Sequence, residues 1–147
     1  MRVKPAKLPL WCRNKRKDLD KTIPLGLYSF CGMEGRVYGG VEGWWNTLSE
    51  AQQEDVNAKV ILLQRYGPAL RRPHSDVIAS SRHPHMKELV IQHAGRPYRV
   101  LYAFDPRRSA ILLLGGDKTG DDRWYVKFVP IADRLYDEHL AAIEKEP

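Results

Sequence analysis

The sequence predicts an α+β fold in which helices pack on a small, mostly antiparallel β-sheet. Between residues 87 and 118, three apolar runs are separated by short turns that contain Gly or Pro, a pattern typical of consecutive antiparallel strands. On both sides of this block, apolar residues recur at helical spacing. The expected element order is therefore β-α-α-β-β-β-α, and 147 residues are enough for one domain with a real core.

The first half of the chain is expected to hold one short strand and two helices. The strand covers residues 36–38 and the first helix covers residues 41–48, which contain two adjacent tryptophans. Ser49 and Gln52 match a capping box, so a longer helix should begin here and end near Gly67. The apolar stripe of this helix consists of Val56, Val60 and Leu63.

Three strands are expected in the second half, over residues 86–93, 98–105 and 110–116. The third is an almost unbroken apolar run, which predicts a central strand buried on both faces. Residues 70–82 are polar and basic and contain a proline, so they are predicted to be a loop.

The chain should end in a helix that starts at Pro130, because proline fits the first turn. Its stripe would consist of Ile131, Leu135 and Ala142. A separate helical turn through Trp124 and Tyr125 is expected before it, with Asp121 or Asp122 as its cap.

The net charge of +6 is distributed very unevenly. Residues 1–32 carry +6 and residues 59–116 carry +7, whereas residues 34–58 carry −4 and residues 117–147 carry −3. A polarised distribution of this kind steers an anionic ligand to one region of the surface. The basic middle section contains the three strands, which favours a sheet that handles a nucleic-acid backbone.

Residues 1–32 differ in composition from residues 33–147, which we expect to form the folded domain. Three interpretations of the first segment stay open: a flexible basic tail, an upstream extension of a protein that starts at Met33, or an arm that adds nonspecific RNA affinity. Both cysteines, Cys12 and Cys31, fall in this segment, which favours a reducing cytoplasm. No apolar stretch is long enough to span a membrane, and no secretion signal is recognisable.

Residues 34–144 resemble the RelE/ParE toxin superfamily, and within it the HigB-like toxins of bacterial toxin–antitoxin systems. The motifs that carry the resemblance are Trp44-Trp45, Arg65-Tyr66-Gly67-Pro68, Lys87-Glu88-Leu89, the strand from Arg96 to Tyr102, and Gly116-Asp117-Lys118. The resemblance implies a RelE-like fold and a ribosome-associated endoribonuclease that cuts messenger RNA. It also implies a cognate antitoxin, a small DNA-binding protein. One departure is Val90, which stands where these toxins commonly have Arg.

Cleavage of RNA by its own 2′-hydroxyl needs a base, cations for the phosphate and an acid for the leaving oxygen. Arg99 is the first candidate as a phosphate clamp, because guanidinium groups bind phosphate through paired hydrogen bonds. The alternative for Arg99 is an ion pair with Glu88 or Asp117. Lys118 is interpreted as a second phosphate contact or a turn lysine, and Lys87 as a base or an edge-strand lysine.

Glu88 is an alternative base, or else a structural partner of Arg99. Tyr125 could stack on a base or assist proton transfer, or simply pack within its helix. Further RNA-contacting cations are expected at exposed positions, namely Arg71, Arg72, Arg96, Arg107, Arg108 and Arg123. The five histidines do not have the spacing of a zinc site, so the sequence predicts a metal-independent reaction without a cofactor.

Two other functions remain compatible with these residues. One is a non-catalytic, ParE-like toxin that inhibits DNA gyrase, for which a phosphate-handling cluster would be unnecessary. The other is a relative that binds only RNA or antitoxin, having lost activity with the arginine that Val90 replaces.

Overall fold

The structure, a computed structural model, describes residues 28–29, 41–106, 108 and 110–145. The strand expected at residues 36–38 lies outside these residues, as do all residues of the predicted tail except two. Strands and helices follow in the order β1 (Tyr28–Ser29), α2 (Val41–Thr47), α3 (Glu50–Tyr66), the 3₁₀ turn η1 (Gly67–Ala69), β2 (Ser75–Val77), β3 (Lys87–His93), β4 (Arg96–Phe104), β5 (Ala110–Asp117) and α4 (Trp124–Glu144). The predicted α+β class is confirmed.

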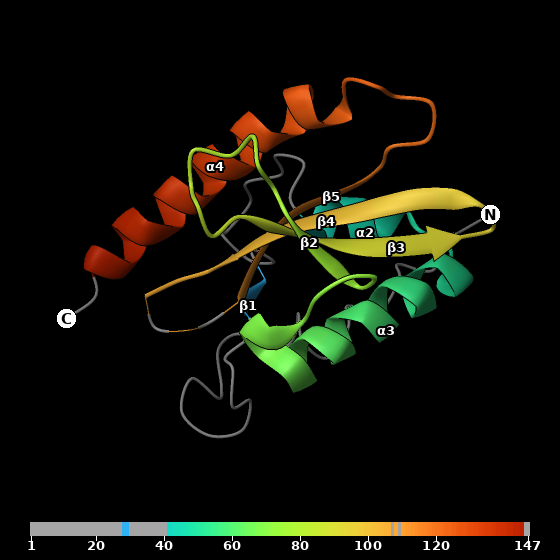
Figure 1. The fold of residues 1–147 in the computed structure, drawn as a ribbon, viewed down its shortest axis with the longest axis horizontal. Helices are drawn as coiled ribbons and strands as arrows, with labels where there is room; N and C mark the ends of the chain where they lie inside the picture. The colour runs from blue at the N-terminus through green and yellow to red at the C-terminus, as the bar shows by residue number, and fades with distance from the viewer. Residues whose placement is uncertain (1–27, 30–40, 107, 109, 146–147) are drawn as a thin grey trace.

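The strands form one sheet in the order β1-β5-β4-β3-β2. Strands β2 to β5 are antiparallel to their neighbours, and the two-residue strand β1 pairs in parallel with Ile111 and Leu112 of β5. Figure 1 shows α4 crossing one face of this sheet and α3 lying along the other. The central strands are therefore covered on both sides, as the apolar run in β5 predicts.

On one face of the sheet, α2 and α3 bury the larger of the two apolar clusters. The capping box at the start of α3 is formed as predicted, with Ser49 accepting from the Gln52 backbone and Gln52 accepting from the Ser49 backbone. The predicted stripe of α3 is buried here against alternate residues of the strands, namely Leu89, Ile91, Tyr98, Val100, Tyr102 and Leu112. Gly115 completes the contact, because a Cβ there would lie 2.2 Å from the Trp44 ring.

On the other face, α4 covers a second apolar cluster built on Leu101, Ala103 and β5. The pairing of β4 with β5 shifts by one residue between Leu101 and Tyr102, which are opposite Leu114 and Leu112. Leu113 is therefore the extra residue of a β-bulge. Both Leu113 and Leu114 belong to the α4-side cluster.

Helix α4 begins six residues earlier than predicted, at Trp124 rather than Pro130. Pro130 lies inside the helix, in its second turn and on its exposed side. Neither predicted cap, Asp121 or Asp122, is the N-cap of α4: that position is Arg123, without a capping side-chain hydrogen bond, and the Asp121 side chain instead accepts from the Arg123 backbone at 3.0 Å in the turn before the helix. The early start is fixed by Trp124, which is buried against Gly116 of β5. Tertiary packing thus outweighs the preference of proline for a first turn.

The segment from 70 to 82 is not entirely loop, because Ser75–Val77 forms β2 at the edge of the sheet. Burial of Ser75 drives this pairing, since its hydroxyl and that of Tyr102 lie 2.5 Å apart in the core. The backbone N–H of Val77 donates a hydrogen bond to the Asp76 carboxylate, and the backbone N–H of Ser75 donates one to the Arg71 carbonyl. The sheet edge is thereby protected from pairing with another strand.

Candidate functional site

Four polar side chains meet on the α4 face of the sheet, near the first turn of α4. Glu88 comes from β3, Arg99 from β4, Lys118 from the residue after β5, and Tyr125 from α4. The register explains the grouping, because Glu88 pairs with Leu101 and Arg99 pairs with Val90, so the two polar residues are diagonal neighbours on one face. Lys118 is held nearby by its backbone N–H, which donates to the Pro97 carbonyl at 3.0 Å.

Glu88 and Arg99 form the centre of this group as a buried ion pair. Their side chains are 9% and 11% exposed, and Arg99 Nε lies 3.7 Å from Glu88 Oε2. This separation suits an ion pair but is too long for a hydrogen bond. Among the described residues, neither of these two buried atoms has a hydrogen-bond partner. Arg99 is oriented instead by Nη1, which donates to the Tyr98 carbonyl at 2.9 Å.

Burial raises the pKa of Glu88 above its ordinary value. The Tyr125 hydroxyl, Arg99 and Lys118 each oppose this shift, because each stabilises the carboxylate form. The carboxylate therefore binds a proton more readily than an exposed glutamate while remaining in contact with cations. These are the properties of a general base that operates near neutral pH.

Tyr125 and Lys118 form the more open side of the group. Burial, followed by the charge of Glu88, raises the pKa of Tyr125 to about 12, so its hydroxyl keeps its proton at neutral pH. The Lys118 ammonium lies 5.1 Å from the centre of the Tyr125 ring, which is within the range of a cation–π contact. Lys118 itself is partly exposed and can reach a ligand.

Val90 lies beside this group, directly opposite Arg99 across the β3–β4 pair. Its side chain is only partly buried. An arginine here would add a second guanidinium next to Arg99. The cluster therefore contains two cations, Arg99 and Lys118, and one carboxylate.

Lys87 is not part of the cluster. It pairs with Val77 and Tyr102 and faces the α3 side of the sheet, the opposite side from Arg99. Its Nζ donates to the Leu70 carbonyl at 3.0 Å, and burial followed by the nearby Arg71 lowers its pKa. The structure brings together two of the three predicted catalytic residues, Arg99 and Lys118.

The other predicted RNA-contacting cations are dispersed. Arg96 lies at the start of β4 near Asp117, with an Nη1–Oδ2 distance of 3.5 Å. Arg123 is exposed just before α4, two residues before Tyr125 of the cluster. Arg108 lies in the β4–β5 turn at the far end of β4 from Arg99, and Arg107 lies outside the described residues.

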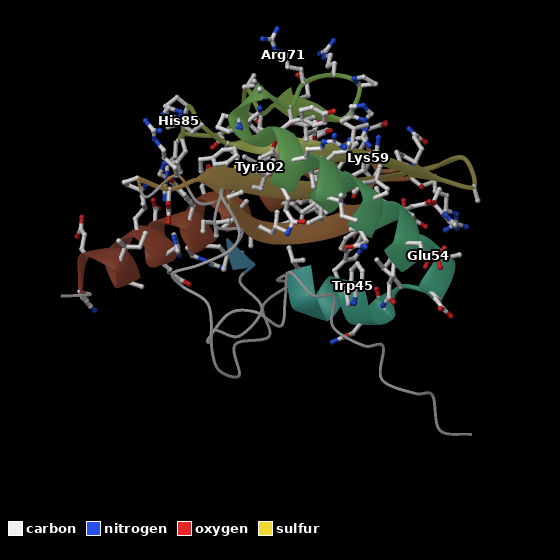
Figure 2. The ribbon with its side chains drawn as sticks, turned by 90° about the horizontal axis from the view of Figure 1, so that it is seen from below. Trp45, Glu54, Lys59, Arg71, His85 and Tyr102 are labelled. Carbon is white, nitrogen blue, oxygen red and sulfur yellow. The ribbon has the colours of Figure 1, made fainter. Side chains whose placement is uncertain are left out.

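Arg71 and Arg72 both follow η1, but their surroundings differ. Arg72 forms an ion pair with Asp76, with 2.7 Å between Nη2 and Oδ2. Arg71 is exposed, and Figure 2 shows it at the outer rim of the molecule.

Three histidines of the described part are engaged with single carboxylates. His93 contacts Asp55 at 2.5 Å, His83 contacts Asp137 at 2.8 Å and His139 contacts Asp105 at 3.0 Å. Within the described residues, no three His, Cys, Asp or Glu side chains converge as metal ligands would. No described helix has the length and apolar character that crossing a membrane requires.

The sequence suggested Glu88 only as an alternative to Lys87, yet the structure places Glu88 at the centre. The available signal was the alternation of side chains along β3. Because Leu89 and Ile91 face the α3-side core, Glu88 must lie on the opposite face, which is also the face of Arg99. Lys87 shares the face of Leu89, so the same alternation separates it from Arg99.

Comparison with known proteins gives one family and two similar relatives. Residues 43–137 match the family of phage-derived Gp49-like proteins (DUF891). The chain is 45% identical to "Putative toxin HigB3" of Mycobacterium tuberculosis over 103 residues, which are 69% of this chain and 89% of that protein. It is 42% identical to "Putative toxin HigB2" of the same organism over 106 residues, which are 71% of this chain and 53% of that protein. No solved structure matches significantly.

Proposed function

We propose that this chain, which belongs to the Gp49-like family of RelE/HigB-type toxins, inhibits growth by cutting messenger RNA without a metal ion. The observation that supports this best is the buried Glu88–Arg99 pair, which has unsatisfied hydrogen-bonding atoms and lies beside Tyr125 and Lys118. A carboxylate with a raised pKa next to two cations suits a reaction that moves a proton and develops negative charge on phosphate.

Glu88 would act as the general base. Its carboxylate accepts the proton of a 2′-hydroxyl, and the 2′-oxygen forms a bond to the adjacent phosphorus. Glu88 Oε2 is buried and has no hydrogen-bond partner among the described residues, so its lone pairs are not committed within the protein. The raised pKa of Glu88 increases its strength as a base.

Arg99 and Lys118 would stabilise the extra negative charge on the phosphate oxygens as the phosphorus gains its fifth bond. The bond from phosphorus to the 5′-oxygen then breaks. Tyr125, whose pKa of about 12 keeps its hydroxyl protonated, would donate the proton that the leaving 5′-oxygen takes. The products are a 2′,3′-cyclic phosphate and a 5′-hydroxyl, and Tyr125 regains its proton from Glu88, its hydrogen-bond partner, which restores both groups.

The relatives' names imply a cognate antitoxin for this toxin family. We propose that this antitoxin is a small DNA-binding protein, and that the ribosome presents the messenger RNA in the cytoplasm. Co-purification of a small protein encoded next to this chain tests the first point. Cleavage of a translated messenger RNA, but not of the same RNA without ribosomes, tests the second.

The main experiment is tightly controlled expression in a bacterium, followed within minutes by mapping of messenger RNA 5′ ends. New ends inside translated frames are expected for the unmodified chain. They should be absent for Glu88→Gln and Arg99→Ala, and they should persist for Glu54→Gln. Glu54 is a matched control because it lies on α3, on the other side of the sheet (Figure 2).

The other outcomes separate the competing functions. Arrested growth with intact messenger RNA and a DNA-damage response would replace this proposal with gyrase inhibition. Normal growth with intact messenger RNA would indicate an inactive relative, and restored cleavage in Val90→Arg would attribute the inactivity to that position. Full cleavage by Glu88→Gln would reject Glu88 as the base.

A further inference from the structure

A second group of cations surrounds the segment from Leu70 to His74, on the α3 side of the sheet. Lys59 comes from α3, Arg71 from the segment itself and Lys87 from β3. Two short contacts tie the lysines to the segment: Lys59 Nζ lies 2.8 Å from His74 Nδ1, and Lys87 Nζ lies 3.0 Å from the Leu70 oxygen. Figure 2, which looks onto this side, shows Lys59 on α3 and Arg71 at the rim.

The partners of these lysines are neutral acceptors. The Leu70 carbonyl carries no net charge, and a His74 nitrogen that accepts from an ammonium must be unprotonated. Within the described part of the chain, no carboxylate lies within ion-pair distance of Lys59, Arg71 or Lys87. The positive charge of the group is therefore oriented by the fold without a directly paired carboxylate, and Asp76 acts on Lys87 only at longer range.

Other surface cations of this protein are paired differently. Arg72 is bound to Asp76, Arg82 to Asp137 and Lys127 to Asp121. The α3-side group differs from these three cations, each of which has a carboxylate as its partner. Burial lowers the pKa of Lys87, Arg71 lowers it further and Asp76 opposes the shift, which indicates that the charges of Arg71 and Lys87 act on each other.

We infer that Lys59, Arg71 and Lys87 form a binding surface for the phosphodiester backbone of RNA, separate from the Glu88 site and on the opposite face of the sheet. The choice of RNA as the polyanion rests on the proposed function. Three cations in contact with backbone phosphates release bound counterions, so they bind without regard to base sequence. This surface anchors RNA away from the bond that is cut.

The test measures binding of a fluorescent 2′-O-methyl RNA 20-mer, which cannot be cleaved, by anisotropy at several salt concentrations. The variants are Lys59→Gln/Arg71→Gln/Lys87→Gln and Arg71→Gln alone. Lys127→Gln is the matched control, because its charge is already paired. A hairpin duplex of the same RNA, used in parallel, distinguishes structured RNA from single-stranded messenger.

Each lost phosphate contact should reduce the slope of log affinity against log salt by about 0.7 for a single strand. The triple variant should therefore lose about 2 from the slope, and Arg71→Gln about 0.7. Between 50 and 200 mM salt, the affinity of the unmodified chain should fall about 18-fold more than that of the triple variant. A smaller slope with either RNA supports the surface and identifies which form it prefers.

Unchanged slopes in both variants, or no RNA binding by the unmodified chain, would overturn the inference. Unchanged RNA binding with weakened binding of the antitoxin would also overturn it and would assign the surface to a protein partner. Glu88→Gln separates this result from the proposed function, because it should lose cleavage and keep the full salt slope.

Discussion

Replacement of Arg99 by Met should destabilise the protein at neutral pH more than replacement of Glu88 by Gln. The asymmetry follows from the environment of the pair. Glu88 has a raised pKa even with Arg99 present, so folding disfavours its charged form relative to the unfolded chain. The uncharged amide introduced by Glu88→Gln would resemble that neutral form. In Arg99→Met, by contrast, a buried carboxylate loses its nearest cation.

The structure sets limits on the size of this effect. At the Nε–Oε2 distance of 3.7 Å, the attraction is about 4.5 kcal/mol for an effective dielectric constant near 20. The loss is capped at a lower value, because Glu88 can take up a proton instead of remaining charged. Protonating a group with an ordinary pKa of 4.5 at pH 7 costs about 3.4 kcal/mol, from 2.5 pH units at about 1.36 kcal/mol each. Part of that cost is already present in the unmodified chain, so we expect Arg99→Met to lose about 1–3 kcal/mol.

The assay is urea unfolding at pH 7 and near pH 4, with Arg134→Met as the control because Arg134 is exposed on α4. The pKa of Glu88 is higher in the folded state than in the unfolded state, so Glu88 stabilises the fold at pH values below its unfolded-state pKa. This contribution is lost as the pH rises through its folded-state pKa. The Arg99→Met deficit should therefore shrink near pH 4, where Glu88 is protonated in both states. Equal stability of Arg99→Met and Arg134→Met, or a deficit that is the same at both pH values, would refute the argument.

Three further substitutions test the packing that supports the site. Gly115→Ala should lower the free energy of unfolding by about 1–3 kcal/mol, because the new Cβ would lie 2.2 Å from the Trp44 ring. Thermal unfolding measures this loss, and a rise in Tm would contradict it. Ser49→Ala removes the capping box of α3 and should cost about 1 kcal/mol in urea unfolding, with an unchanged midpoint as the contrary result. Tyr102→Phe leaves the buried Ser75 hydroxyl without its partner and should cost about 1–3 kcal/mol, so a neutral effect would show that the 2.5 Å contact contributes little.

The sequence was sufficient for elements whose signal is local. The capping box and Gly67 define α3, and strict alternation defines β4, so both elements are found close to their predicted bounds. It failed where distant residues decide. Ser75 forms a strand because Tyr102 provides a buried partner, and Trp124 starts α4 because Gly116 leaves room for its ring. Neither contact can be read from neighbouring residues.

The candidate site was predictable in composition but not in arrangement. Arg99, Lys118 and Tyr125 were identified from their residue types, and the structure groups them. Lys87 and Glu88 are adjacent in sequence and both polar, so residue type alone does not choose between them. The choice depends on which face of β3 carries Leu89, and that is a property of the whole sheet.

The β-bulge at Leu113 determines on which side of the sheet the last residues of β5 lie. Before it, even-numbered residues such as Leu112 face α3; after it, Gly115 faces α2 and Gly116 faces α4. Regular pairing of all these residues, without the bulge, would reverse that parity, placing Gly116 against Trp44 and turning Lys118 away from Glu88. Deletion of Leu113 would instead leave Leu114 alone on the α4 side, so that Gly115 and Gly116 keep their sides. The bulge therefore allows β5 to hold one extra residue while Lys118 stays on the side of Glu88.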